Sequence, residues 1–378
     1  MRVLLLFIAI AVAANGQRHK IEEVNAEKPE GKLLQQILQE SDEAKKAALL
    51  DRFAGEFPKD EGTPWVLEQL QAIYVKDNDG KGSNADKIIA TGDKLLALDP
   101  DDPEAAVQCL KAAEAKKDAA LIKKYSGMAS AAARKLAAAP EPKDADEAAA
   151  WKAQSAYAKG VEQYADYAIY RATVESRDPK LTIDLGEALR QRNPGGDYAG
   201  KVSQPLFVAY RLAGDQAKAL ALAEKVAATD QSSEDMLLVL VDSYMQQKKE
   251  PEKVHAYSAA IVQLMGQKPK PEGVSDADWL ARKNQITGLA RYLNGKLYHN
   301  ENNFANSDVE LRGALPLVET NPAIKPEVLY LLALSNFKLD KPQEAANYFR
   351  ACAAIKSPFQ QLATTNLARV KSQYTGVK

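Results

Sequence analysis

The sequence predicts an all-α protein built from short helices that stack in pairs. Apolar residues recur along most of the chain at three- and four-residue intervals, which places them on one face of a helix. No run alternates polar and apolar residues over the length of a strand. Glycine and proline cluster between the periodic runs, where they end one helix and begin the next. Abundant alanine, with only 7% aromatic residues, suits helices that pack closely.

The clearest pair lies within residues 326–358, which read as two amphipathic helices joined by a tight turn. This stretch resembles one tetratricopeptide repeat (TPR), a helix–turn–helix unit of about 34 residues. One position departs from the pattern, because Asn336 takes the place of the first-helix aromatic residue and Phe337 follows it. The matching positions are the small residues Ala333, Ala345 and Cys352 and the large residues Leu329, Leu332 and Phe349.

A second stretch, residues 277–318, matches the repeat in strict spacing, whereas the match is weak over residues 104–178. The resemblance implies that about eight helix pairs stack into a right-handed α–α superhelix, a TPR-like solenoid. A helix over residues 359–374 would cover the last pair as a C-terminal capping helix. The strictly matching positions are Gly295, Tyr298, Ser307, Leu311 and Ala314.

Capping residues and prolines mark the helix ends in the N-terminal half. Asp42 begins the second helix, Thr63 caps the third with Pro64 in its first turn, and Asp99 with Pro100 ends the fourth. The long helix in this half, over residues 144–174, is nearly twice as long as an ordinary repeat helix. The expected pairs are 32–40 with 43–57, 63–75 with 85–98, 104–116 with 119–138, and 144–174 with 180–192.

Residues 194–200 (PGGDYAG) form the predicted bend of the chain. The bend separates N-terminal degenerate helical repeats, residues 32–193, from C-terminal TPR-like repeats with the capping helix, residues 201–378. Beyond the bend, the expected pairs are 204–212 with 216–228, 234–247 with 252–265, 277–298 with 304–318, and the two helices of 326–358.

Residues 1–16 read as a secretory signal peptide. Arg2 supplies the positive start, and the apolar run over residues 3–14 is shorter than the roughly 20 residues that span a bilayer. Small residues predict cleavage after Ala13 or Gly16, and no cysteine follows at a lipobox position. A retained membrane anchor is the alternative. We expect an exported protein, periplasmic or secreted, with a flexible lead-in over residues 17–31.

The net charge and the cysteine and histidine residues limit the classes of function that this protein could have. The 378-residue chain has a formal net charge of −1, which argues against the basic surface of a nucleic-acid-binding protein. The two cysteines, Cys109 and Cys352, lie in distant helices, so we expect buried thiols rather than a disulfide. The three histidines, His19, His255 and His299, are scattered, and no metal-binding or nucleophile motif surrounds them. We therefore predict no catalytic residue, no cofactor and no metal.

In TPR proteins, the first helices of successive repeats line a concave groove that holds a peptide or helix of a partner. The resemblance therefore implies a non-catalytic protein–protein interaction scaffold, which the leader would place in the cell envelope. Neither a nucleic-acid partner nor stable membrane insertion after leader cleavage is expected. Phe337 lies beside the packing position, so we expect it to face the groove. The groove candidates, each of which could instead pack against neighbouring repeats, are Arg211, Asp242, Met245, Tyr292, Lys296, His299, Asn300, Tyr330 and Phe337.

Two alternative functions stay open at this point. The long helix carries Tyr157 and Tyr164 on one face and Tyr167 and Tyr170 on another. These tyrosines could form the cleft of a periplasmic or secreted peptide- or glycan-binding protein, or pack against helices on both sides. The second alternative is a helical-toroid enzyme that acts on polysaccharide. It would need a histidine in a deep pocket beside an arginine and a carboxylate.

Overall fold

The computed structural model describes residues 18–21, 23–78, 82–374 and 376–377. The predicted leader and its cleavage sites lie outside the described residues. Within these ranges every element of regular secondary structure is a helix, which confirms the predicted all-α fold class. None of the described helices is both long and apolar enough to cross a membrane.

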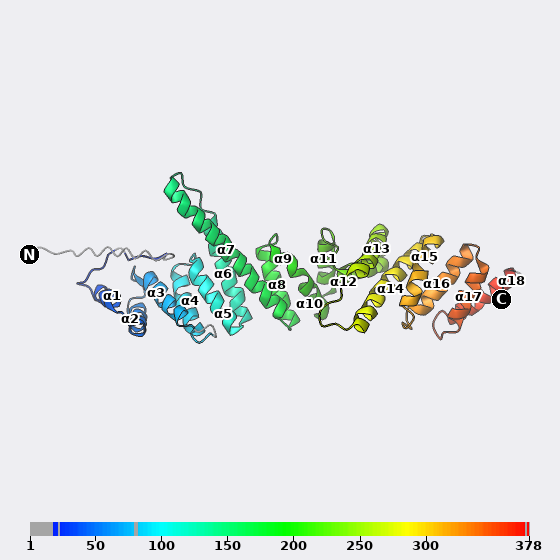
Figure 1. Cartoon of the computed structure of the whole chain (residues 1–378), viewed down its shortest axis with the longest axis horizontal. Coiled ribbons are helices and arrows are strands. Elements are labelled where there is room, and N and C mark those ends of the chain that lie inside the picture. The colour runs from blue at the N-terminus through cyan, green and yellow to red at the C-terminus, as the bar shows by residue number, and fades with distance from the viewer. Residues whose placement is uncertain (1–17, 22, 79–81, 375, 378) are drawn as a thin grey trace, which may run out of the picture. The chain divides into compact units, whose positions relative to one another are not determined.

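The chain forms two compact units, which divide between Ala213 and Gly214. Within each unit, successive helices are joined by short connections and pack as antiparallel neighbours (Figure 1). Unit 1 contains α1 (Pro29–Gln39), α2 (Glu43–Glu56), α3 (Thr63–Lys76), α4 (Ala85–Leu98), α5 (Pro103–Lys116), α6 (Ala119–Ala137), α7 (Ala145–Glu175), α8 (Pro179–Arg192), α9 (Asp197–Lys201) and α10 (Ser203–Leu212). Unit 2 contains α11 (Gln216–Ala227), α12 (Glu234–Gln247), α13 (Pro251–Gln267), α14 (Asp276–Asn300), α15 (Phe304–Ala314), η1 (Leu315–Leu317), α16 (Lys325–Lys338), α17 (Pro342–Ala353) and α18 (Gln360–Gln373).

Aspartate caps fix several helix starts in unit 1. Asp42, Asp102 and Asp118 each accept a hydrogen bond from the backbone N–H three residues later, at the starts of α2, α5 and α6. The expected cap at Thr63 is wrong, because Gly62 occupies the cap position of α3. The Thr63 hydroxyl instead donates to the carbonyl oxygen of Phe57 at 2.6 Å, which ties the start of α3 to the end of α2.

The long helix of the weakly matched region is α7, with 31 residues. Among its described side chains the first buried one is Ala158, and Figure 1 shows the N-terminal end of the helix projecting away from the other helices of unit 1. The remainder packs against α5, α6, α8 and α9. The helix is therefore anchored in the core only along its C-terminal part.

The predicted bend at residues 194–200 lies inside unit 1. The short helix α9 occupies it and packs against α7, α8 and α10, and the ring of Tyr198 lies 5.1 Å from that of Tyr170. The division between the units falls after α10 instead. As a result α10 and α11, which the sequence predicts as one pair, belong to different units.

The packing of unit 2 confirms the TPR-like repeat. A Cβ atom on Gly295 would lie 2.6 Å from Leu311 Cγ, so α14 and α15 cross where only glycine fits. Helix α18 packs against α17 as the predicted cap. Cys109 and Cys352 are buried free thiols, as predicted. All six matching positions of α16 and α17 are buried: Leu329, Leu332, Ala333, Ala345, Phe349 and Cys352.

Candidate functional site

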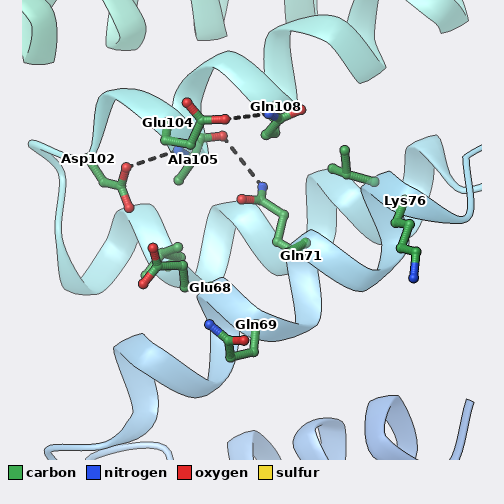
Figure 2. A pocket seen from close by; sticks show the side chains of 11 residues that line it. Glu68, Gln69, Gln71, Lys76, Asp102, Glu104, Ala105 and Gln108 are labelled. Atoms are coloured by element: carbon green, nitrogen blue, oxygen red, sulfur yellow. Dashed lines mark hydrogen bonds between the residues drawn. The ribbon is translucent and has the colours of Figure 1, made fainter. Parts of the chain in front are cut away.

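A pocket of about 260 Å³ opens between α3 and α5 of unit 1 (Figure 2). Both are the first helices of their pairs, the position at which a TPR-like stack is expected to line its groove. The apolar part of the wall includes Val75 and Leu95. The polar part comes from Glu68, Gln69, Gln71 and Lys76 of α3 and from Asp102, Glu104 and Gln108 at the start of α5.

The pocket is acidic at one end. Figure 2 shows Glu68 and Asp102 at this end and Lys76 toward the opposite end. Asp102 is held in place as the cap of α5, because its Oδ1 accepts the Ala105 N–H at 3.0 Å. Lys76 forms an ion pair with Glu43 of α2. Its charge is thereby offset, and the two carboxylates dominate the other end.

Gln71 ties the helices around the pocket together. Its side chain is buried, and its Nε2 donates to the carbonyl oxygens of Ile88 at 3.3 Å and Ala105 at 3.5 Å. One amide therefore links α3 to both α4 and α5. This link joins the walls of the pocket.

The pKa values of the two carboxylates at the acidic end shift in opposite directions. Burial raises the pKa of Glu68, although the backbone N–H groups of Arg18 and His19 bond the carboxylate and oppose the rise. Burial would also raise the pKa of Asp102, but the His19 ring and the Ala105 N–H lower it below its ordinary value. Asp102 thus stays ionised, and a cation near Glu68 would stabilise its charged form.

An extended segment of the same chain crosses the acidic end. We call residues 18–21 and 23–24 the strap. The backbone N–H groups of Arg18 and His19 donate to Glu68 Oε1 at 3.1 Å and Oε2 at 3.2 Å. The Arg18 Nε donates to Asp99 Oδ2 at 2.5 Å. Part of the expected lead-in therefore makes specific contacts with unit 1.

The tyrosine side chains of α7 contact neighbouring helices. The Tyr157 and Tyr164 hydroxyls donate to Glu104 and Glu114 of α5, and burial and these carboxylates raise the pKa of both tyrosines. On the other face, the Tyr167 ring lies 5.7 Å from the ring of a tyrosine in α9. These contacts match the expected packing on two sides.

Two of the predicted groove residues come together in unit 2. The Tyr292 hydroxyl donates to Glu327 Oε2 at 2.6 Å, and Lys296 Nζ lies 2.7 Å from Glu327 Oε1. Tyr292 is buried, and burial followed by the Glu327 contact raises the pKa of its hydroxyl. The cluster bridges α14 and α16 and holds Tyr292 in place as a hydrogen-bond donor.

The next predicted residue, His299, is half-buried between the same two helices. Its Nδ1 lies 2.9 Å from Ser335 Oγ, and its ring meets Phe304 edge-on at 5.4 Å. Burial, with a smaller effect from Lys338, lowers the pKa of His299. The structure therefore favours a neutral imidazole at this position.

The other predicted residues lie apart from this cluster. Arg211 is exposed in unit 1, beside the ring of Phe207, whereas Asp242 and Asn300 are exposed and Met245 is half-buried in unit 2. The nine candidates are thus divided between the units. Arg211 belongs to unit 1, whereas the other eight candidates belong to unit 2.

Tyr330 and Phe337 pack with the C-terminal end of unit 2. The Tyr330 ring lies 5.9 Å from that of Phe349 and 5.4 Å from that of Phe359. Phe337 is half-buried, and its ring meets Tyr374 edge-on at 6.2 Å. Both rings are partly covered by the region of α18.

His255, like His299 a candidate for the histidine of the alternative enzyme site, packs against α14 and Glu301. Its Nδ1 lies 2.6 Å from Asn294 Oδ1, its Nε2 lies 3.0 Å from Glu301 Oε2, and its ring stacks on Tyr298 at 4.0 Å. Neither His255 nor His299 lines the α3–α5 pocket. Among the described side chains, no group of three histidine, cysteine or acidic residues is arranged to hold a metal.

No family model matches this sequence, and no curated protein does. Among solved structures, the chain is similar to one in the APC/C hetero-tetramer Cut9–Hcn1, with 15% identity over 92% of this chain and 56% of that chain, at a TM-score of 0.33. It is also similar to the P58(IPK) TPR domain, with 11% identity over 92% of this chain and 100% of that chain, at a TM-score of 0.27. A third similar structure is yeast Tom70, with 11% identity over 92% of this chain and 97% of that chain, at a TM-score of 0.21.

The predicted groove candidates begin at Arg211, and none of them lines the α3–α5 pocket. The rule that predicts a groove applies equally to α3 and α5, since both are first helices of pairs. The available signal was three acidic residues, Glu68 on α3 and Asp102 with Glu104 at the start of α5.

Proposed function

We propose that this protein is a non-catalytic scaffold of the cell envelope that binds an extended segment of a partner protein across the first helices of unit 1. The observation that carries the proposal is the α3–α5 pocket, whose walls belong to the first helices of successive pairs. A partner segment that crosses these helices would contact several pairs at once.

The size and chemistry of the pocket favour a peptide over a small molecule. At about 260 Å³ it is smaller than the roughly 300–1,000 Å³ of typical small-molecule sites. The Gln69 and Gln108 amides in its wall can hydrogen-bond a peptide backbone, and Val75 with Leu95 offers an apolar contact. The acidic end favours a partner with positive charge.

Filling the pocket should remove partner binding. Ala72 lies exposed on the pocket wall, so Ala72→Trp would fill the cavity without entering the core. Ala90 is exposed on α4 and does not line the pocket, which makes Ala90→Trp the matched control. The folded full chain and both variants would be used as bait in an envelope extract. We expect a specific partner to be recovered with the unsubstituted chain and the control but lost with Ala72→Trp.

The proposal is contradicted when the folded chain recovers no specific partner, or when both tryptophan variants recover it equally well. The leader supports the envelope location. Mass spectrometry of the protein from an envelope fraction should then find an N-terminus at Gln17 or Ala14. Recovery only from the cytosol, with residues 1–16 intact, would argue against export.

A further inference from the structure

The strap is seated on the acidic end of the pocket in the manner of a bound peptide. Its chain has no helix, and its first two described N–H groups bond to the two oxygens of one carboxylate, Glu68. The Arg18 guanidinium reaches both oxygens of Asp99, with Nε at 2.5 Å and Nη2 at 3.3 Å. Such two-point contact is the geometry in which arginine recognises carboxylates. A basic extended segment is thus already present on this surface, and it belongs to the chain itself.

Other contacts hold the strap further along the chain. Ile21 and Val24 pack against the apolar core of unit 1. Where the segment turns into α1, a Cβ atom on Gly31 would lie 1.8 Å from the carbonyl oxygen of Asn25, so this close approach requires glycine. These contacts do not involve the acidic end. They keep the strap beside the pocket even when its basic end is displaced.

We propose that the strap is an internal competitor for the partner site. A partner segment with an arginine or lysine binds Glu68, Asp99 and Asp102 by displacing Arg18 and His19. This inference rests on the proposed function, and it specifies the chemistry of the partner and the regulation of the same site.

Covalent attachment makes the strap an effective competitor. A tethered segment acts at an effective concentration of roughly millimolar, so even a short contact occupies the site most of the time. A partner must either bind more strongly or meet the protein when the strap is weakened. The carboxylates stay paired in both states, which avoids leaving a half-buried charge without a cation.

His19 makes the strap sensitive to pH. Its Nε2 lies 3.5 Å from Asp102 Oδ2 and 3.6 Å from Asp99 Oδ2, so the attraction is mainly between charges. Glu68 and Arg18, which shares Asp99, are the other charged groups here. The Asp102 carboxylate raises the pKa of His19 against the effect of burial, and Glu68 and Asp99 add to the rise. Protonated His19 holds the strap below about pH 6.5, and this hold is lost as pH rises through the raised pKa.

The test uses a labelled, N-terminally acetylated peptide with the sequence of residues 18–28, RHKIEEVNAEK, so that Arg18 keeps its amide N–H, and measures its binding to the full chain by fluorescence anisotropy. The Arg18→Ala/His19→Ala double variant has a weakened internal competitor. We expect it to bind the peptide about tenfold more tightly than the unsubstituted chain, the size of one charge-assisted contact. Adding Glu68→Gln to the double variant should reverse this gain. Adding Glu56→Gln, on the exposed Glu56–Arg52 pair of α2, should leave it unchanged.

Three results would overturn the inference: no binding to the double variant, equal binding to the double variant and the unsubstituted chain, or no effect of Glu68→Gln when circular dichroism shows a folded protein. Peptide affinity for the double variant should also fall as pH rises above about pH 6.5. A peptide with glutamine in place of histidine should show no such fall. Partner recovery that still depends on Ala72 would leave the proposed function standing when the strap experiment fails.

Discussion

At the scale of single residues, Asn336 explains the one departure from the repeat pattern. It is fully buried, and its Nδ2 donates to Asp308 Oδ1 of α15 at 2.7 Å. Asp308 also accepts from Arg312, whose guanidinium reaches Glu344 of α17 at 2.8 Å. A polar chain across three helices thus replaces the packing of an aromatic ring. The displaced aromatic residue, Phe337, packs with the C-terminal cluster instead.

Adding a single Cβ atom at Gly295 tests how closely α14 and α15 pack. In Gly295→Ala the new Cβ would lie 2.6 Å and 2.8 Å from side-chain atoms of Leu311, which is fully buried and has little room to move. We expect the free energy of unfolding to fall by about 1–3 kcal/mol, the cost of overpacking a core. Chemical denaturation followed by circular dichroism measures this change.

Gly266, in α13 of the same unit, serves as the control, because a Cβ atom added there would have no neighbouring atom within 4 Å. Gly266→Ala should leave stability unchanged or raise it by up to about 1 kcal/mol, because alanine favours the helix. Equal effects of the two substitutions would show that α14 and α15 do not cross closely at Gly295.

At the scale of elements, a buried ion pair joins α6, α7 and α8. Arg192, at the end of α8, lies 2.8 Å from Asp166 Oδ1 of α7 and donates to Ser126 Oγ of α6 at 3.0 Å. Asn193 adds a hydrogen bond from its Nδ2 to Asp166 Oδ2 at 2.7 Å. The side chain of Asp166 is only 4% exposed and that of Arg192 is 14% exposed, so removing the carboxylate would leave a largely buried guanidinium without its counter-charge.

We expect Asp166→Ala to lower the free energy of unfolding by about 3–5 kcal/mol, since one partner of a buried pair remains uncompensated. The control is Asp184→Ala, which breaks the exposed Asp184–Lys123 pair between α8 and α6 and should cost no more than about 1 kcal/mol. Thermal and denaturant unfolding of both variants checks the comparison. Similar losses of stability in the two variants would mean that burial does not determine how much the Arg192–Asp166 pair contributes to the free energy of unfolding.

At the scale of the whole molecule, the two units hold histidines whose pKa values shift in opposite directions. In unit 1, Asp102 raises the pKa of His19, and in unit 2 burial lowers that of His299. His19 therefore stabilises its docked position when protonated. His299 stabilises unit 2 when neutral, since the folded chain binds its proton less well than the unfolded chain does.

A histidine titration followed by NMR should separate these two residues. His19 should titrate above about pH 6.5 and His299 below it. The contribution of His299 to stability is present above about pH 6.5 and is lost as pH falls toward its lowered pKa. His299→Gln should remove this acid-dependent loss, whereas His19→Gln should not. Titration of both histidines at the same pH would contradict the environments described here.

The helices, the repeat unit and the burial of its small residues could be predicted from the amino-acid sequence. These features follow from local rules: apolar spacing, caps such as Asp42, and close crossings that leave room only for residues such as Gly295. The pocket between α3 and α5 could not be predicted in this way, nor could the contacts of Arg18 with Glu68 and Asp99, which lie 50 and 81 residues away. Polar contacts over such separations leave no periodic signal in the sequence, because they depend on how the helix pairs stack.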